Sequence, residues 1–152
     1  MVDCLRLKID MEDDGTARLS ATVLSQGFSG LGSAWFGVPD IEGFAHQLAT
    51  TYPLGASNKL SLRGGYWDCA EQPRLDQRHL SIEFYPIGFR GEIGCRVELA
   101  TSVQGQGRPE SQHCVAVELR TTYEGIKAFG TALLSLLKAI EPEAVLEAVA
   151  VE

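Results

Sequence analysis

The sequence has no long hydrophobic run, and its apolar residues are spread in short segments between charged ones. No stretch approaches the roughly 20 apolar residues of a membrane-spanning helix, so no membrane span is predicted. The N-terminal segment MVDCLRLKIDMEDD carries charges from Asp3 onward and has no apolar core of a secretory signal. We therefore expect a cytoplasmic protein.

Basic residues are outnumbered, with 13 Lys and Arg against 20 Asp and Glu and a formal net charge of −7. Such a surface repels phosphate backbones and anionic lipids, which argues against nucleic-acid binding and against membrane-surface binding. An acidic surface suits a basic protein partner, and it also simply keeps a protein soluble. The charge alone leaves both explanations open.

Cysteine is present but lacks the spacing of a redox or zinc motif. Cys4, Cys69, Cys95 and Cys114 are scattered without a C-x-x-C pair. In a reducing compartment this pattern predicts free thiols, although the even number keeps disulfides as an alternative.

Motifs of catalysis and cofactor binding are also missing. The glycine-rich stretch 26–37, QGFSGLGSAWFG, fits neither G-x-G-x-x-G nor a P-loop, and no G-x-S-x-G is present. No histidine or cysteine pair has the spacing of zinc ligands. The sequence thus predicts no metal, no cofactor and no catalytic residue, and we expect a protein that is not an enzyme.

The clearest pattern that the chain does contain lies at 79–99, HLSIEFYPIGFRGEIGCRVEL. Apolar and polar residues alternate on both sides of a Gly/Pro break, which predicts an antiparallel hairpin with one buried face. Cys95 falls on the buried side and His79 on the exposed side. Glu83 and Arg96 are expected to face each other on the exposed side. We expect a solvated sheet surface formed by the glutamates on this side and on the equivalent side of a later strand: Glu83, Glu92, Glu98 and Glu118.

Further strands are predicted by the same alternation at 5–11, 17–24, 31–36, 60–62 and 115–119. Asp14-Gly15 predicts a hairpin between the first two strands. Gly64-Gly65 is expected to stop the strand at 60–62. The glycines of 26–37 predict a bent strand in which another backbone or an aromatic ring comes close.

Helices are predicted at two places. Apolar residues at i, i+3, i+4 and i+7 from Ile41 onward indicate a helix that ends near Thr51. The sequence Thr121-Thr122-Tyr123-Glu124 fits a capping box with Thr121 as N-cap, followed by an apolar stripe through Ile140. A last short helix is expected from Pro142 through Val151.

The resulting order is β-β-β-α-β-β-β-β-α-α, which is typical of an α+β protein. We expect one domain, 1–152, with a mostly antiparallel sheet of about six to seven strands and helices packed on one face. The segment 141–152 is predicted to be a short helix or a frayed tail. Because such a segment could contact a second copy, a homodimer through it is also open.

A long polar loop is predicted at 66–77, and it carries the candidate partner-binding residues. It places aromatic side chains beside carboxylates: Tyr66, Trp67, Asp68, Glu71 and Asp76. Aromatic residues outside regular alternation often anchor a protein partner, and they also often fold back as a lid on the core. The sequence leaves the choice between interface and lid open.

The strand GFSGLGSAWF, the helix IEGFAHQL and the hairpin 79–99 together resemble small bacterial immunity proteins of the WapI type, from contact-dependent toxin systems. The resemblance covers most of the chain as an order of elements. It implies a non-enzymatic protein that binds a cognate toxin domain, a class of partner that is often basic. The alternative is a small-molecule-binding protein or an enzyme with a pocket between sheet and helices.

Overall fold

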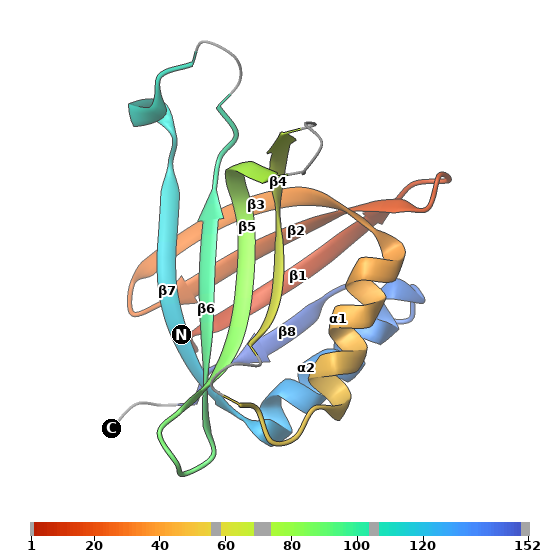
Figure 1. Cartoon of the computed structure of the whole chain (residues 1–152), viewed down its shortest axis with the longest axis vertical. Coiled ribbons are helices and arrows are strands. Elements are labelled where there is room, and N and C mark those ends of the chain that lie inside the picture. The colour runs from red at the N-terminus through yellow and green to blue at the C-terminus, as the bar shows by residue number, and fades with distance from the viewer. Residues whose placement is uncertain (1, 56–58, 69–73, 104–106, 150–152) are drawn as a thin grey trace.

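Two antiparallel sheets of four strands replace the single predicted sheet, within the α+β class that was expected. The computed structural model describes residues 2–55, 59–68, 74–103 and 107–149 (Figure 1). Sheet A has the order β3-β2-β1-β8, and sheet B has the order β4-β5-β6-β7. The strands are β1 (Cys4–Met11), β2 (Thr16–Ser25), β3 (Phe28–Gly37), β4 (Leu60–Asp68), β5 (Arg74–Ile87), β6 (Glu92–Ala100), β7 (Cys114–Thr122) and β8 (Ala144–Glu147).

Glycine allows β3 to cross the inner face of sheet B, which is why the strands split into two layers. A Cβ atom at Gly32 would lie 2.5 Å from the carbonyl oxygen of His79, and one at Gly30 would overlap Val115. At Gly64 the nearest atom would be the ring of Phe36, at 2.7 Å. The prediction that glycines of 26–37 let another backbone come close is confirmed at Gly32.

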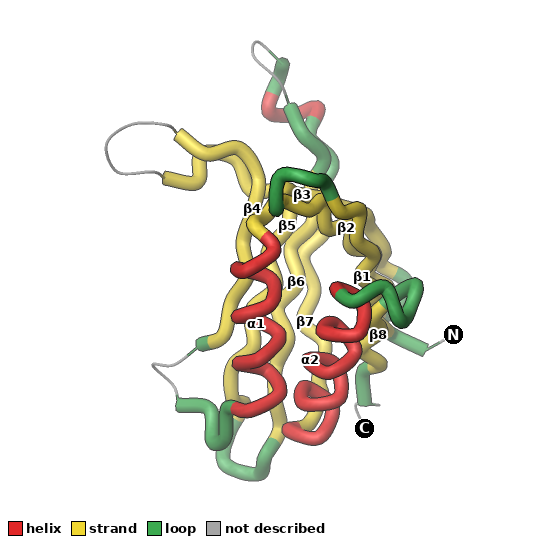
Figure 2. Tube along the Cα trace, turned by 90° about the vertical axis from the view of Figure 1, so that its right-hand side faces the viewer, coloured by secondary structure: helices red, strands yellow, loops and turns green. Residues whose placement is uncertain are grey.

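The helices α1 (Val38–Thr50) and α2 (Tyr123–Leu137) lie side by side over the sheets (Figure 2). Glycine again sets the approach, because a Cβ atom at Gly130 would lie 2.6 Å from the carbonyl oxygen of Ala45. Apolar side chains of both sheets and both helices meet in one core, with the rings of Phe44, Phe84 and Phe129 close together. The space between sheets and helices is therefore filled by side chains.

The cap of α2 lies one residue later than predicted. Thr122 is the N-cap, and its hydroxyl oxygen accepts a hydrogen bond from the backbone N–H of Gly125 at 3.0 Å. Thr121 is buried, because β7 continues to Thr122 and turns the Thr121 side chain toward the core. The helix ends at Leu137, so Ile140 lies outside it and is exposed.

The predicted helix at 142–151 is wrong, since Ala144–Glu147 forms β8 at the edge of sheet A. Ala144 and Leu146 are buried opposite Leu7 and Leu5 of β1, which supplies the backbone partners that a short helix would lack. After β8 the chain passes to sheet B, where the Val149 N–H donates to the Arg120 carbonyl oxygen at 2.9 Å. A homodimer through this segment stays a prediction.

The strand predicted at 60–62 is too short. Instead of stopping β4, Gly64-Gly65 forms a bulge, and pairing with β5 continues to Asp68. Only glycine fits at position 65, because φ is +157° and a Cβ atom would overlap the carbonyl oxygen of Gln77. The register shift brings His79 inward, so its predicted exposure is wrong: the side chain is 5% exposed.

Candidate protein-binding surface

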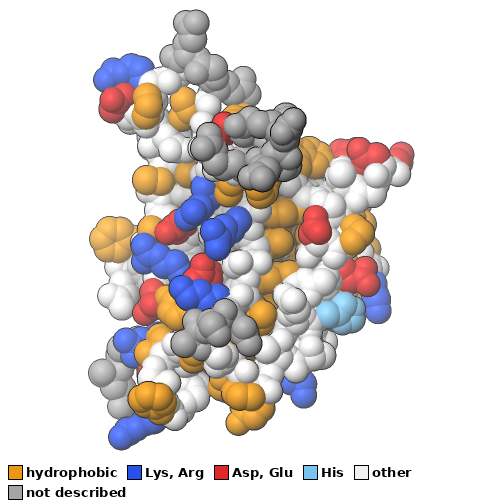
Figure 3. Space-filling view, in the orientation of Figure 1, with side chains coloured by type: hydrophobic (Ala, Val, Ile, Leu, Met, Phe, Trp, Pro, Cys, Tyr) orange, Lys and Arg blue, Asp and Glu red, His pale blue; other side chains and the backbone are white. Residues whose placement is uncertain are grey.

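The outer face of sheet B carries a dense layer of charged side chains (Figure 3). Leu80, Ile82 and Phe84 of β5 point into the core, so alternate residues of the same sheet point outward. We call the outward set the charged face: Lys59, Arg63, Arg78, Glu83, Glu92, Arg96, Glu98, Glu118 and Arg120. Its five basic and four acidic residues make it much more basic than the chain as a whole. The predicted outward direction of the glutamates is confirmed.

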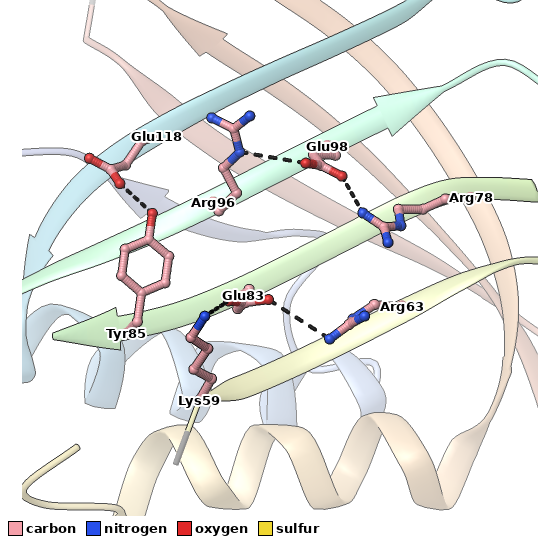
Figure 4. Close-up of polar contacts among 8 residues, drawn as sticks. All are labelled: Lys59, Arg63, Arg78, Glu83, Tyr85, Arg96, Glu98 and Glu118. Atoms are coloured by element: carbon pink, nitrogen blue, oxygen red, sulfur yellow. Dashed lines mark hydrogen bonds and ion pairs between the residues drawn. The ribbon is translucent and has the colours of Figure 1, made fainter. Parts of the chain in front are cut away.

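Glu98 holds two arginines on this face (Figure 4). Its Oε2 atom lies 2.5 Å from Nη1 of Arg78 on β5, and its Oε1 atom lies 3.5 Å from Nε of Arg96. Exposed pairs of this kind contribute little to stability. They do restrict the two long side chains, which reduces the conformational entropy that a bound partner would have to remove.

Glu83 holds a second pair of cations. Its carboxylate oxygens lie 3.3 Å from Nζ of Lys59 and 3.9 Å from Nη2 of Arg63. Glu83 also faces Arg96 in the ladder between β5 and β6, as predicted, although the ion pair of Arg96 is with Glu98. Each of these two glutamates therefore lies between two cations, and each cluster keeps an excess of positive charge.

Tyr85 closes one end of the charged face. Its ring lies over Gly94 of β6, where a Cβ atom would overlap it, and its hydroxyl donates a hydrogen bond to Glu118 of β7. Burial raises the pKa of the Tyr85 hydroxyl, and the bond to Glu118 raises it further. The phenol therefore stays protonated and keeps Glu118 in place.

The candidate residues of the segment 66–77 belong to strands and not to a loop. Tyr66, Trp67 and Asp68 end β4, Asp76 lies near the start of β5, and Glu71 lies outside the described residues. Trp67 is 50% exposed and Tyr66 is 40% exposed, so neither ring is a buried lid on the core. We call residues 66–68 and 74–77 the tip.

Polar contacts join the tip to buried His79 and to the chain after β6. The ring of Tyr66 meets the buried ring of His79 edge-on, with centroids 4.6 Å apart. Gln77 links His79 to the chain after β6: its amide oxygen accepts from His79 Nε2 at 2.5 Å and from the Val103 N–H at 2.8 Å, and its amide group donates to the Val103 carbonyl at 2.9 Å. Burial lowers the pKa of His79, which favours the neutral ring.

A groove joins the tip to the charged face. It has a volume of about 380 Å³, and its lining includes Leu75 and Asp76 of the tip together with Gln112, Cys114 and Ala116. Arg78 and Glu98 also line it, and they belong to the charged face. The groove therefore connects Leu75 and Asp76 of the tip with Arg78 and Glu98 of the charged face, and of the candidates from the sequence it includes Asp76.

No protein-family model, curated protein or solved structure matches the chain. No helix in the described part of the chain is long and apolar enough to cross a membrane. Among the described residues, no three His, Cys, Asp or Glu side chains gather in a way that could hold a metal ion.

A larger hollow lies on the outer face of sheet A. Its volume is about 770 Å³, and its lining includes Cys4, Arg6, Thr22 and Leu31. The alternative function left open by the sequence places a pocket between sheet and helices, a region where the described apolar side chains form the core. Cys4, Cys95 and Cys114 carry free thiols, as expected, and Cys69 lies outside the described residues.

Sequence reasoning missed the arginines of the charged face. Alternation along each strand shows that Arg96 points outward, but it does not show which side chains stand beside it. That information depends on strand order, which places Arg78 next to Glu98 across β5 and β6. The signal in the sequence was the frequency of arginine at outward positions, which is unusual in an acidic chain.

Proposed function

We propose that this chain is a non-enzymatic protein-binding module of the immunity type, which neutralises a cognate bacterial toxin domain. Its binding surface is the tip, the groove and the charged face of sheet B. The observation that carries the proposal is the combination of half-exposed Tyr66 and Trp67 with arginines that are already held in place. Trp, Tyr and Arg are the side chains that dominate the binding energy of protein interfaces.

The two parts of the surface have different roles in the proposal. Trp67 projects from the end of β4 and acts as the anchor, because its exposed half offers a large apolar area to a partner pocket. Arg78 and Arg96 keep N–H groups beyond those used by Glu98, and these can donate to partner carboxylates or carbonyls. The anchor supplies affinity, and the arginines fix the orientation of the partner.

The charge of this chain indicates what kind of partner to expect. The net charge of −7 draws a basic domain toward the chain as a whole and speeds its encounter, an effect that weakens as salt rises. The charged face itself has a slight excess of positive charge, so its arginines call for acidic groups or carbonyls at the matching positions of that domain. The alternating signs of the charged face then select among basic partners, since a surface with the wrong pattern would place like charges together. A toxin domain that acts on nucleic acid fits this description, because it is basic for its own substrate.

The competing proposal is a small-molecule-binding protein or an enzyme. The hollow on sheet A has the size of a ligand site, about 300–1,000 Å³. Arg6 is the cation beside it, and Arg6 is paired with Glu143 at 2.7 Å. The surface of sheet B offers more exposed aromatic and arginine groups to a partner than this hollow does, so protein binding is preferred.

The test begins with the gene neighbourhood: if a toxin-like domain is encoded beside the gene for this chain, it is the domain to express, and a neighbourhood without one would count against the proposal. Co-expression is expected to restore growth of cells that carry the domain, and the purified pair is expected to form a stable complex. Arg96→Gln should weaken the complex, because it removes one charge of the pattern without placing a like charge opposite Glu83 and Glu118 in the ladder. A folded toxin domain that neither binds the chain nor loses activity in its presence would overturn the proposal.

A further inference from the structure

β3 crosses sheet B and extends beyond its last strand, β7, where no strand of sheet B lies opposite it in the described part of the chain. Phe36 lies over Gly64 of β4, Gly32 lies over β5 and β6, and Gly30 lies over β7. β7 is the last strand of sheet B, yet β3 continues past it for one further inward-facing residue, Phe28. The β2–β3 hairpin visibly extends beyond β7 (Figure 1). A fifth strand of sheet B would lie over this extension.

Phe28 is largely exposed although it lies on the inner face of sheet A, as expected if no strand packs against it. It pairs with Ser25 and shares the inner face of sheet A with Gly30 and Phe36. Ser25 and Phe36 are buried, whereas Phe28 is 69% exposed. An aromatic ring on the inner face of a sheet is normally packed against the opposite layer. Here the opposite layer ends one strand too early.

The backbone of β7 is open on the same side. Arg120 directs its carbonyl oxygen away from β6, where it accepts from the Val149 N–H. Residues two and four positions earlier, Glu118 and Ala116, direct their N–H and C=O groups the same way. Within the described part of the chain, no backbone group bonds to them. The edge can therefore form further ladder bonds.

Side chains of β7 show the same lack of cover. Val115 and Val117 face inward but are only partly buried, whereas their ladder partners on β6, Leu99 and Val97, are fully buried. An apolar side chain of an added strand would cover the two valines and Phe28 together. The edge thus offers both backbone bonds and apolar contact.

Charge on the outer face indicates what the added strand carries. One row across sheet B reads Ser61, Glu83, Arg96 and Glu118, from β4 to β7. The last three alternate in sign, and opposite charges are favoured in directly facing pairs. The next position in this row, beside Glu118, therefore suits Lys or Arg.

We propose that the β7 edge takes an extended segment of the protein partner as a fifth strand of sheet B. The segment places apolar side chains on Phe28, Val115 and Val117 and a basic side chain beside Glu118. Main-chain bonds give such strand addition its affinity, and alternate side chains give it specificity. This inference rests on the proposed function, since it names how part of the partner binds.

Residue-resolved amide hydrogen exchange tests the proposal with a synthetic ten-residue peptide. The peptide alternates valine with threonine and carries lysine at the position that faces Glu118. In the free chain, the amides of Ala116 and Glu118 should exchange about 100-fold faster than those of Val117 and Leu119. Saturating peptide should slow the two edge amides by about tenfold or more.

Matched controls distinguish strand addition from nonspecific hydrophobic binding of the peptide. Phe28→Ser should weaken peptide binding about tenfold, whereas Leu31→Ser should leave it unchanged. Leu31 is 63% exposed and lies on the same strand, but on the opposite face. A peptide that is N-methylated at its edge-facing amides should not bind, because it cannot form the ladder.

Three results would overturn the proposal. Slow exchange of Ala116 and Glu118 in the dilute free chain would show that the chain covers its own edge. Protection that rises with protein concentration would assign the edge to a second copy. Equal binding by the methylated peptide would exclude a ladder. None of these results affects the tip and the charged face, whose role is tested separately through Arg96 and Trp67.

Discussion

Gly32 is the position where one added methyl group should destabilise the fold most clearly. A Cβ atom there would lie 2.5 Å from the carbonyl oxygen of His79 and 3.0 Å from Cβ of Leu99. Both groups belong to β5 and β6, the central strands of sheet B, so neither can move without disturbing two ladders. Overpacking of this kind costs about 1–3 kcal/mol. Gly32→Ala should therefore lower the free energy of unfolding by about 2 kcal/mol, and the melting temperature by about 4–8 °C.

Two further glycines make the test selective. Gly43 lies on α1 with no atom within 4 Å of an added Cβ, so Gly43→Ala should stabilise the chain by up to about 1 kcal/mol. Gly30→Ala should cost less than Gly32→Ala, because Val115 lies on the edge strand β7, whose backbone can move while disturbing one ladder and not two. Urea unfolding followed by circular dichroism gives all three values. If Gly32→Ala were as stable as the unmodified chain, the two sheets would not cross at β3.

Other expectations follow from single side chains. Thr122→Ala should cost about 1 kcal/mol in urea unfolding, and an unchanged midpoint would mean that α2 begins elsewhere. Because the pKa of His79 is lowered in the folded chain, the unfolded histidine binds a proton below about pH 6.5 that the folded one does not bind. The free energy of unfolding should therefore be highest above about pH 6.5 and should fall below it, by at most about 1.4 kcal/mol per pH unit. Unfolding at pH about 7.5 and 5.5 should show a smaller loss in His79→Gln than in the unmodified chain, and equal losses in the two would exclude this role. In a titration with a thiol reagent, Cys114→Ser should have one fast-reacting thiol fewer than the unmodified chain, whereas Cys95→Ala should have the same number. Burial shields the Cys95 thiol and raises its pKa. A fast-reacting thiol missing from Cys95→Ala would contradict the burial of Cys95.

The strands were predictable because their evidence is local. Alternation at 79–99 gave a hairpin whose register, with Glu83 opposite Arg96, is confirmed. The split into two sheets was not predictable in the same way. Gly30 and Gly32 indicated a close approach, but the partners, Val115 and His79, lie far along the chain.

The C-terminal segment shows a second reason for failure. Four residues, Ala144–Glu147, are too few for alternation to be decisive, and only the free edge of β1 makes them a strand. The same applies to the candidate surface. Trp67 was identified from composition, but the neighbouring arginines of the charged face come from strands that only the folded sheet brings together.

The most direct measurement of the central claim is a kinetic binding titration with two variants of the chain, each checked by a melting curve, against a toxin-like domain if one is encoded beside its gene. Trp67→Ala should raise the dissociation rate about tenfold or more without a matching loss of stability. Phe89→Ala is the matched control, because Phe89 is a fully exposed ring at the opposite end of β5 and should have no effect. Unchanged dissociation of Trp67→Ala, or an equal effect of Phe89→Ala, would contradict the assignment of this surface to partner binding.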